Sequence, residues 1–127
     1  GVGNPTTLVR AVAAGVDMFD CVLPTRTARM GTAFSNEGRL NLKNARFAHD
    51  HGVLDEGCDC PACAGGFTRG YIHHLIRQKE MLGGLLLSQH NIRYLLRLME
   101  RARAAIIAGT YASFVSEWMD SPAANDF

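Results

Sequence analysis

The stretch that most constrains this chain is GCDCPACAGG, residues 57–66, which places three cysteines within six positions. Cys58, Cys60 and Cys63 bring three sulfurs onto one short loop, and glycines on both sides allow its backbone to turn. Structural zinc sites use four tetrahedral ligands, usually thiolates with or without an imidazole. The spacing therefore predicts a zinc site that needs one more ligand, and the alternative is three free thiols.

Several side chains are candidates for the fourth ligand. The histidines are His49, His51, His73, His74 and His90. His73 and His74 fall in a helix expected just after the loop, and His90 precedes a longer amphipathic helix. Spacing alone does not choose among them. The fourth cysteine, Cys21, lies beside an expected buried strand and is interpreted as a core thiol.

Length and composition fit one globular domain, with 127 residues of which 47% are apolar and 20% charged. No apolar run approaches the roughly 20 residues of a membrane span, and the N-terminus lacks the pattern of a secretory signal. Cysteines grouped as three plus one fit a reducing compartment better than a disulfide framework. We expect a cytoplasmic protein that does not bind a membrane.

The net charge of +1 hides two basic blocks. Residues 21–51 carry five basic and two acidic side chains, and residues 68–103 carry seven basic and two acidic ones. Such blocks are compatible with a polyanionic partner. The alternative is the ordinary solvated faces of helices.

The N-terminal part reads as half of an α/β unit. Asn4 followed by Pro5 predicts a helix start, and Gly15 predicts its end. The apolar run VDMFDCVLP, residues 16–24, then predicts a buried strand closed by proline. Partner strands of this kind do not follow, so we expect the chain to begin in the middle of a larger fold.

The remainder reads as a hairpin followed by helices. We expect the hairpin over residues 32–47, helices over 68–82 and 91–108, and a short helix through Phe114 and Trp118. The pair Gly83-Gly84 is expected to break or bend the chain between the first two helices, and SPAAND, residues 121–126, is expected to be a frayed end.

Two carboxylates flank the expected strand. Asp17 and Asp20 lie where catalytic groups are often found in barrels, although an aspartate bonded to nearby backbone is the alternative. Arg26 and Arg29 follow, either as exposed surface arginines or as phosphate contacts.

Four motifs, GVDMFDCVLPTRTARMG, GCDCPAC, RGYIHHLI and HNIRYLLRLM, follow one another in the chain. In this order they closely resemble the C-terminal third of bacterial tRNA-guanine transglycosylase, also called queuine tRNA-ribosyltransferase, from Gly1 to about Phe114. The resemblance implies an α/β fold: the last part of a (β/α)8 TIM barrel with a zinc-binding subdomain, the present chain being mainly α with a small β hairpin. It divides the chain into the last barrel units (residues 1–31), the zinc-binding subdomain (32–90) and a C-terminal helical segment (91–127).

The same resemblance implies an activity. The family exchanges guanine at wobble position 34 of GUN anticodons in tRNA for 7-aminomethyl-7-deazaguanine, in queuosine biosynthesis, through a covalent glycosyl-aspartate intermediate. Asp20 matches the nucleophile, Arg26 and Arg29 match an RNA-binding segment, and Gly1 matches a glycine near the base pocket. A second active-site aspartate would precede Gly1, so this chain alone is expected to be inactive.

The family's zinc is structural, and its ligands match Cys58, Cys60, Cys63 and the histidine of the HN pair, His90. The expected partners are the tRNA anticodon loop, guanine, the 7-deazaguanine base and a second copy in a homodimer. Two departures stand out: a longer, glycine-rich AGGFTRGY segment, and a C-terminus without the usual basic, aromatic ending. Two alternatives remain: a zinc-stabilised RNA-binding or dimerisation module, and a non-catalytic partner subunit.

Overall fold

A computed structural model describes all 127 residues of the chain. Its elements, in order, are α1 (Pro5–Ala13), α2 (Leu23–Arg29), β1 (Thr32–Ser35), β2 (Gly38–Asn41), the 3-10 helix η1 (Ala45–Phe47), α3 (Pro61–Ala64), α4 (Arg69–Arg77), α5 (Met81–Ile107), α6 (Tyr111–Asp120) and α7 (Pro122–Asp126). The expectation of a mainly helical chain with one small hairpin is confirmed. No helix combines the length and apolar character that crossing a membrane requires.

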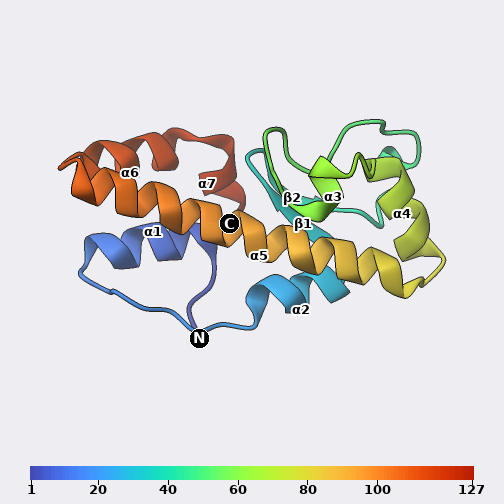
Figure 1. Ribbon diagram of the computed structural model, residues 1–127, viewed down its shortest axis with the longest axis horizontal. Coiled ribbons are helices and arrows are strands. Elements are labelled where there is room, and N and C mark those ends of the chain that lie inside the picture. The colour runs from blue at the N-terminus through green and yellow to red at the C-terminus, as the bar shows by residue number, and fades with distance from the viewer.

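The 27-residue helix α5 is the axis of the molecule. Its buried side chains include Leu87, Asn91, Tyr94, Leu98 and Ala102, a spacing of three or four residues that keeps them on one face. Figure 1 shows α5 running from end to end, with α1, α6 and α7 at one end and the hairpin, α3 and α4 at the other. The same helix therefore contributes buried side chains to both ends of the molecule.

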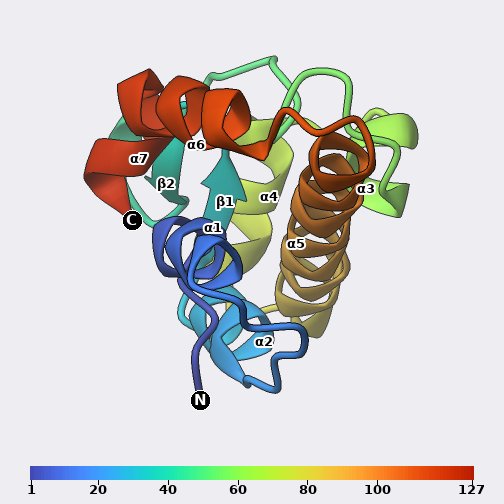
Figure 2. The same cartoon turned by 90° about the vertical axis from the view of Figure 1, so that its left-hand side faces the viewer.

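Two groups of buried side chains lie along α5. The cysteine-side core contains Ala28, Ala33, Leu40, Leu42, Phe47, Leu54, Cys58, Cys60, Ala62, Cys63, Ile72, Leu75, Leu86 and Leu87. The terminal core contains Val9, Phe34, Tyr94, Leu98, Ala102, Phe114, Trp118, Ala123 and Ala124. In the view along α5 of Figure 2, α6 lies above α1, which brings the two ends of the chain into one layer.

The hairpin forms as predicted, with β1 antiparallel to β2 and Ser35 paired with Gly38 across the turn. The Ser35 hydroxyl donates to the Gly38 carbonyl (2.9 Å) and accepts from the Glu37 amide (3.1 Å), which closes the turn. The Asn36 amide donates to the Asp55 carboxylate (2.8 Å). These bonds tie the hairpin to the segment that leads into the cysteine loop.

The strand predicted over residues 16–24 is absent, and that prediction is wrong for this chain. Residues 16–22 form neither helix nor strand, Met18 is 88% exposed, and α2 begins at Leu23. The only sheet is β1–β2, so this segment has no strand beside it to bond. Cys21 is half-buried rather than a core thiol, and its sulfur accepts from the Leu23 amide (3.2 Å).

Two predictions about helix ends are also corrected. The chain breaks at residues 78–80, where Lys79 has a φ of 58°, and α5 runs unbroken through Gly83 and Gly84. A Cβ on Gly83 would lie 2.9 Å from Ile76 Cδ1, so this glycine allows α4 and α5 to approach closely. SPAAND is not frayed: it forms α7 and buries Ala123 and Ala124.

Candidate metal centre and nucleophile segment

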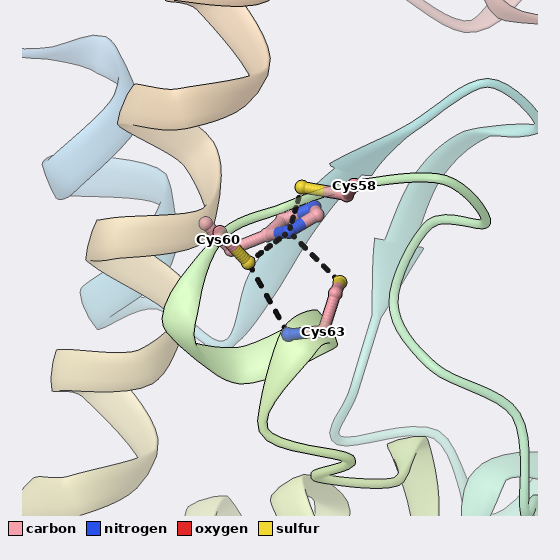
Figure 3. A group of neighbouring side chains, drawn as sticks. Cys58, Cys60 and Cys63 are labelled. Atoms are coloured by element: carbon pink, nitrogen blue, oxygen red, sulfur yellow. Dashed lines mark hydrogen bonds between the residues drawn. The ribbon is translucent and has the colours of Figure 1, made fainter.

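The loop before α3, α3 itself and α5 bring the candidate metal ligands together. Cys58 lies in the loop before α3, Cys60 caps that helix by accepting from the Cys63 amide (3.3 Å), and Cys63 lies within it. His90 comes from the interior of α5, not from its start as the sequence suggested. All four side chains are buried, and Figure 3 shows the three thiols converging on a common centre.

The ligand atoms have the spacing of a tetrahedral site. His90 Nδ1 lies 3.3 Å from the Cys60 sulfur, 3.5 Å from that of Cys63 and 3.7 Å from that of Cys58. Zinc bonds of about 2.3 Å to sulfur and about 2.0 Å to nitrogen, at tetrahedral angles, would separate these atoms by about 3.5 Å. The donor set and its dimensions therefore fit Zn²⁺.

A hydrogen bond of the second ring nitrogen of His90 determines which nitrogen faces the sulfurs. His90 Nε2 lies 2.7 Å from the carbonyl oxygen of Phe34. Because a carbonyl only accepts, Nε2 carries a proton, and Nδ1 is left as the ring nitrogen that faces the cysteines and could bind a metal ion. A metal-binding histidine held by a backbone carbonyl is the usual arrangement around zinc.

Hydrogen bonds within the cluster shift the pKa values of its members. Burial disfavours a charged His90, but hydrogen bonds with the Cys58 and Cys60 sulfurs outweigh it and raise the pKa of His90 to about 9. The hydrogen bond between Cys63 and Cys60 lowers the pKa of the Cys60 thiol and raises that of Cys63. Thiolate character at Cys60 is thus stabilised by its neighbours, whereas zinc binding would have to displace the protons held by His90 Nδ1 and Cys63.

An ion-pair network fastens the cysteine loop to α5. Arg93 binds both oxygens of Asp59, through Nε (2.6 Å) and Nη2 (3.0 Å), and its Nη1 binds Glu100 (2.8 Å). The hydrogen bonds from Arg93 lower the pKa of the Asp59 carboxyl. Asp59 lies between two of the cysteines, so this contact holds the loop against the helix that carries His90.

Asn91 is a structural residue that the sequence analysis missed. Its side-chain oxygen accepts from the Phe34 amide (2.9 Å), and its nitrogen donates to the carbonyls of Pro24 (3.0 Å) and Thr32 (2.9 Å). His90 and Asn91 therefore bind the carbonyl and the amide of one residue, Phe34. The signal in the sequence was a polar side chain on the otherwise apolar face of a helix.

The segment of Asp20 lies apart from the metal cluster. Asp20 is exposed and lines a hollow of about 340 Å³ together with Gly1, Cys21 and Arg26. A Cβ on Gly1 would lie 2.7 Å from the Asp20 carbonyl oxygen, so the first residues run closely along this segment. Arg29 lines a different hollow, of about 870 Å³, between α2, α4 and the first turns of α5.

The family model for queuine tRNA-ribosyltransferase matches residues 1–124. The chain belongs to the queuine tRNA-ribosyltransferase family. The queuine tRNA-ribosyltransferase of Thermus thermophilus is 58% identical over 118 residues, which is 93% of this chain and 30% of that protein. Those of Sphingopyxis alaskensis and Symbiobacterium thermophilum are 54% and 53% identical and are covered to 31% and 30%. The chain thus spans about a third of the length of these relatives.

The metal centre can be interpreted within the queuine tRNA-ribosyltransferase family. The buried Cys3His cluster is consistent with a structural zinc site. All four side chains are buried, and His90 is hydrogen-bonded on its far side, so the ion would have no open position for a substrate. The zinc would link the cysteine loop, α5 and the hairpin.

Proposed function

We propose that the chain is the C-terminal third of a tRNA-guanine transglycosylase. The complete enzyme would exchange guanine at wobble position 34 of GUN anticodons for 7-aminomethyl-7-deazaguanine, in queuosine biosynthesis. The observation that carries the proposal is an exposed Asp20, beside Gly1 and Arg26 in one hollow, within a chain that matches the family over residues 1–124.

Asp20 would act as the nucleophile. Its carboxylate attacks C1′ of the target nucleotide, the glycosidic bond breaks, and guanine leaves with the bonding electrons. The incoming base then displaces Asp20 from the opposite face, so two inversions preserve the configuration of the sugar. The proton transfers belong to an acid-base aspartate upstream of Gly1. The target base must be turned out of its loop to reach the carboxylate.

Arg26 and Arg29 would bind the RNA around the target. Arg26 lines the hollow of Asp20 and makes no ion pair with an acidic side chain, so its guanidinium is free to bind a phosphate or a base edge. Gly1 would border the base, because a side chain there would collide with the backbone of Asp20.

The remainder of the enzyme would complete the fold. In a (β/α)8 barrel, residues 16–22 would gain the neighbouring strands that they lack here. The zinc site would stabilise the subdomain without taking part in the chemistry, and the enzyme would work as a homodimer. Reduced cysteine ligands fit the cytoplasm as its location.

A chimera tests the function. The chain replaces the matching third of the Thermus thermophilus relative, and incorporation of labelled guanine into tRNA is measured. We expect the chimera to exchange guanine and the 127-residue chain alone to be inactive. Asp20→Asn should reduce exchange about a thousandfold or more. Asp17→Asn, a matched change on the same exposed segment, should leave it near the parent value.

Robust turnover by the Asp20→Asn chimera would remove Asp20 as the nucleophile. A chimera that folds and binds tRNA but exchanges no base would instead favour the RNA-binding module or the non-catalytic partner subunit.

A further inference from the structure

The last residues of the chain lie against the outer edge of the hairpin, the edge of β2 that faces away from β1. Helix α7 is only five residues long and buries Ala123 and Ala124. The Thr6 hydroxyl donates to the Ala124 carbonyl (3.3 Å) and accepts from the Trp118 indole (3.1 Å). Figure 2 shows α7 beside β2, with β1 on the other side of that strand. Contacts with α1 and α6 thus place the residues after Ala124 at the hairpin.

The hairpin leaves one backbone amide of β2 facing outward. Phe34 lies opposite Arg39 in the register of the two strands. The Phe34 amide donates to Asn91 and its carbonyl accepts from His90, so both groups point toward α5 rather than β2. In an antiparallel ladder such a pair exchanges no hydrogen bonds, and the backbone groups of the opposite residue also point away. The Arg39 amide therefore needs a partner at the outer edge.

Asp126 and Phe127 cover this edge. The Arg39 amide donates to the Asp126 carboxylate. A Cβ on Gly38 would lie 2.8 Å from the Cβ of Asp126, so the glycine leaves room for this close approach. The Phe127 ring packs edge-on against the Phe34 ring, with centroids 5.2 Å apart and planes at 88°. We call Asp126 and Phe127 the clasp, because the first binds β2 and the second packs against β1.

Phe34 connects the clasp to the metal centre. Its side chain is 1% exposed and packs in the terminal core, where the Tyr94 ring contacts both Phe34 and Phe127. Its carbonyl accepts from His90 Nε2 and so orients the ring nitrogen that faces the three cysteines. A displacement of Phe34 would therefore disturb a candidate metal ligand.

We propose that the clasp holds Phe34 in place and thereby slows the release of metal from the Cys3His centre. Asp126 and Phe127 lie beyond residues 1–124, which the family model matches, and this role does not depend on the proposed function of Asp20. Opening of the clasp would free the edge of β2 and let β1 move together with Phe34. His90 would then lose the hydrogen bond that orients it, and its hold on the metal would weaken.

The test measures transfer of zinc from the zinc-loaded 127-residue chain to a chromogenic chelator. Asp126→Ala and Phe127→Ala should each accelerate transfer about three- to tenfold, because each removes a contact that holds the hairpin. Asn125→Ala is the matched control, since it changes an exposed side chain of the same helix, and it should leave the rate unchanged. Unchanged rates in both clasp variants would overturn the proposal.

Tyr111→Phe separates the clasp from a general loss of stability. The Tyr111 hydroxyl donates to the Val9 carbonyl (2.7 Å), a bond between α6 and α1 that involves neither the hairpin nor the cysteines. This variant should lower the melting temperature without accelerating zinc transfer. If transfer rates simply follow the melting temperature across all variants, the clasp has no specific link to the metal centre and the proposal fails.

Amide hydrogen exchange provides a readout at the hairpin itself. In the zinc-loaded protein, both clasp variants should raise the exchange rates of the Phe34 and Arg39 amides, while Asn125→Ala should not. Unchanged exchange at Phe34 would contradict the proposal even if zinc transfer became faster, because the link through Phe34 would then be absent.

The dependence on protein concentration shows whether the clasp closes within one chain. An intramolecular clasp makes the rate of zinc transfer independent of protein concentration. If transfer from the parent slows as its concentration rises, and the clasp variants abolish this dependence, Asp126 and Phe127 bind a second copy and the intramolecular clasp is wrong.

Discussion

His90 and Asn91 are neighbours that bind the two backbone groups of Phe34. In a helix, consecutive side chains diverge by about 100° around the axis. Here that divergence places one side chain on the sulfur cluster and the other on the carbonyls of Pro24 and Thr32. The start of α2, β1 and the metal centre are thus positioned by two adjacent residues.

Asn91→Ala should lower the free energy of unfolding by about 2–4 kcal/mol, because it leaves the Phe34 amide and two carbonyls buried without partners. Urea denaturation measures the change. Gln89→Ala, on the exposed side of the same turn, should stay within about 0.5 kcal/mol of the parent. Equal effects of the two substitutions would show that the buried amide contributes little.

Asp55 should give stability a measurable pH dependence. Burial raises the pKa of Asp55 above its ordinary 3.8, although the Asn36 amide and the charges of His90, Arg97 and Arg69 lower it in part. The folded state therefore takes up this proton more readily than the unfolded state, so the contribution of Asp55 to stability increases as the pH falls and is lost as it rises.

The comparison with Asp55→Asn isolates this effect. The parent should gain stability relative to the variant between about pH 6 and pH 4, measured as the difference between their urea unfolding free energies. Acid loss of zinc affects both proteins and largely cancels in the difference. A difference that stays constant across this range would contradict the raised pKa.

At the scale of elements, α5 can be probed at its two glycines. Gly84→Ala should stabilise the chain by about 0.5–1 kcal/mol, because alanine is the better helix former. No atom within 4 Å of the added Cβ opposes this gain. Gly83→Ala is the matched change and should destabilise the chain, because its Cβ would lie 2.9 Å from Ile76 Cδ1. Thermal unfolding of both variants measures the contrast, and a Gly84→Ala variant less stable than the parent would argue for a bend in α5.

The elements predicted from sequence are those that local chemistry determines. The N-cap at Asn4 and the turn of the hairpin depend on nearby residues and form as expected. The glycine pair was misread because helix propensity is weak and the contact between Gly83 and Ile76 outweighs it. The strand over 16–24 was misread because an apolar run cannot supply its own hydrogen-bonding neighbour.

The candidate site, too, could be predicted from the sequence only where its residues lie close together in the chain. Three thiols on one loop are visible in the spacing, but the histidine that reaches them lies 27 residues beyond Cys63. Spacing alone left five histidines open, and the resemblance to a family singled out His90. The structure brings its ring to the thiols, although its role as a ligand stays a prediction. The hollow that Arg29 lines is built from residues between Thr25 and Ser88 and has no local motif.

For the whole molecule, metal removal is the decisive perturbation. Binding of a structural zinc ion contributes directly to folding, so chelation should lower the melting temperature. After metal removal, the rate of amide hydrogen exchange should rise first in the cysteine-side core. Helices α1, α6 and α7 pack in the terminal core and have no metal contact, so their amides should stay protected longer. Uniform loss of protection along the chain would contradict this order.

Metal content identifies the ligands. The parent should hold one zinc ion per chain by elemental analysis, and Cys58→Ala and His90→Ala should release it. His74→Ala is the control, since this exposed histidine lies outside the cluster. Full metal retention by His90→Ala would mean that another group completes the site.

The continuity of α5 limits where insertions and deletions can be tolerated. Adding one residue between His90 and Leu98 would rotate the rest of the helix by about 100°, so the face that buries Leu98 and Ala102 would turn away from the terminal core. A change of length at Gly66, in the loop between α3 and α4, would not rotate one part of a helix against another. A change of length should therefore be less damaging in this loop than within the central turns of α5.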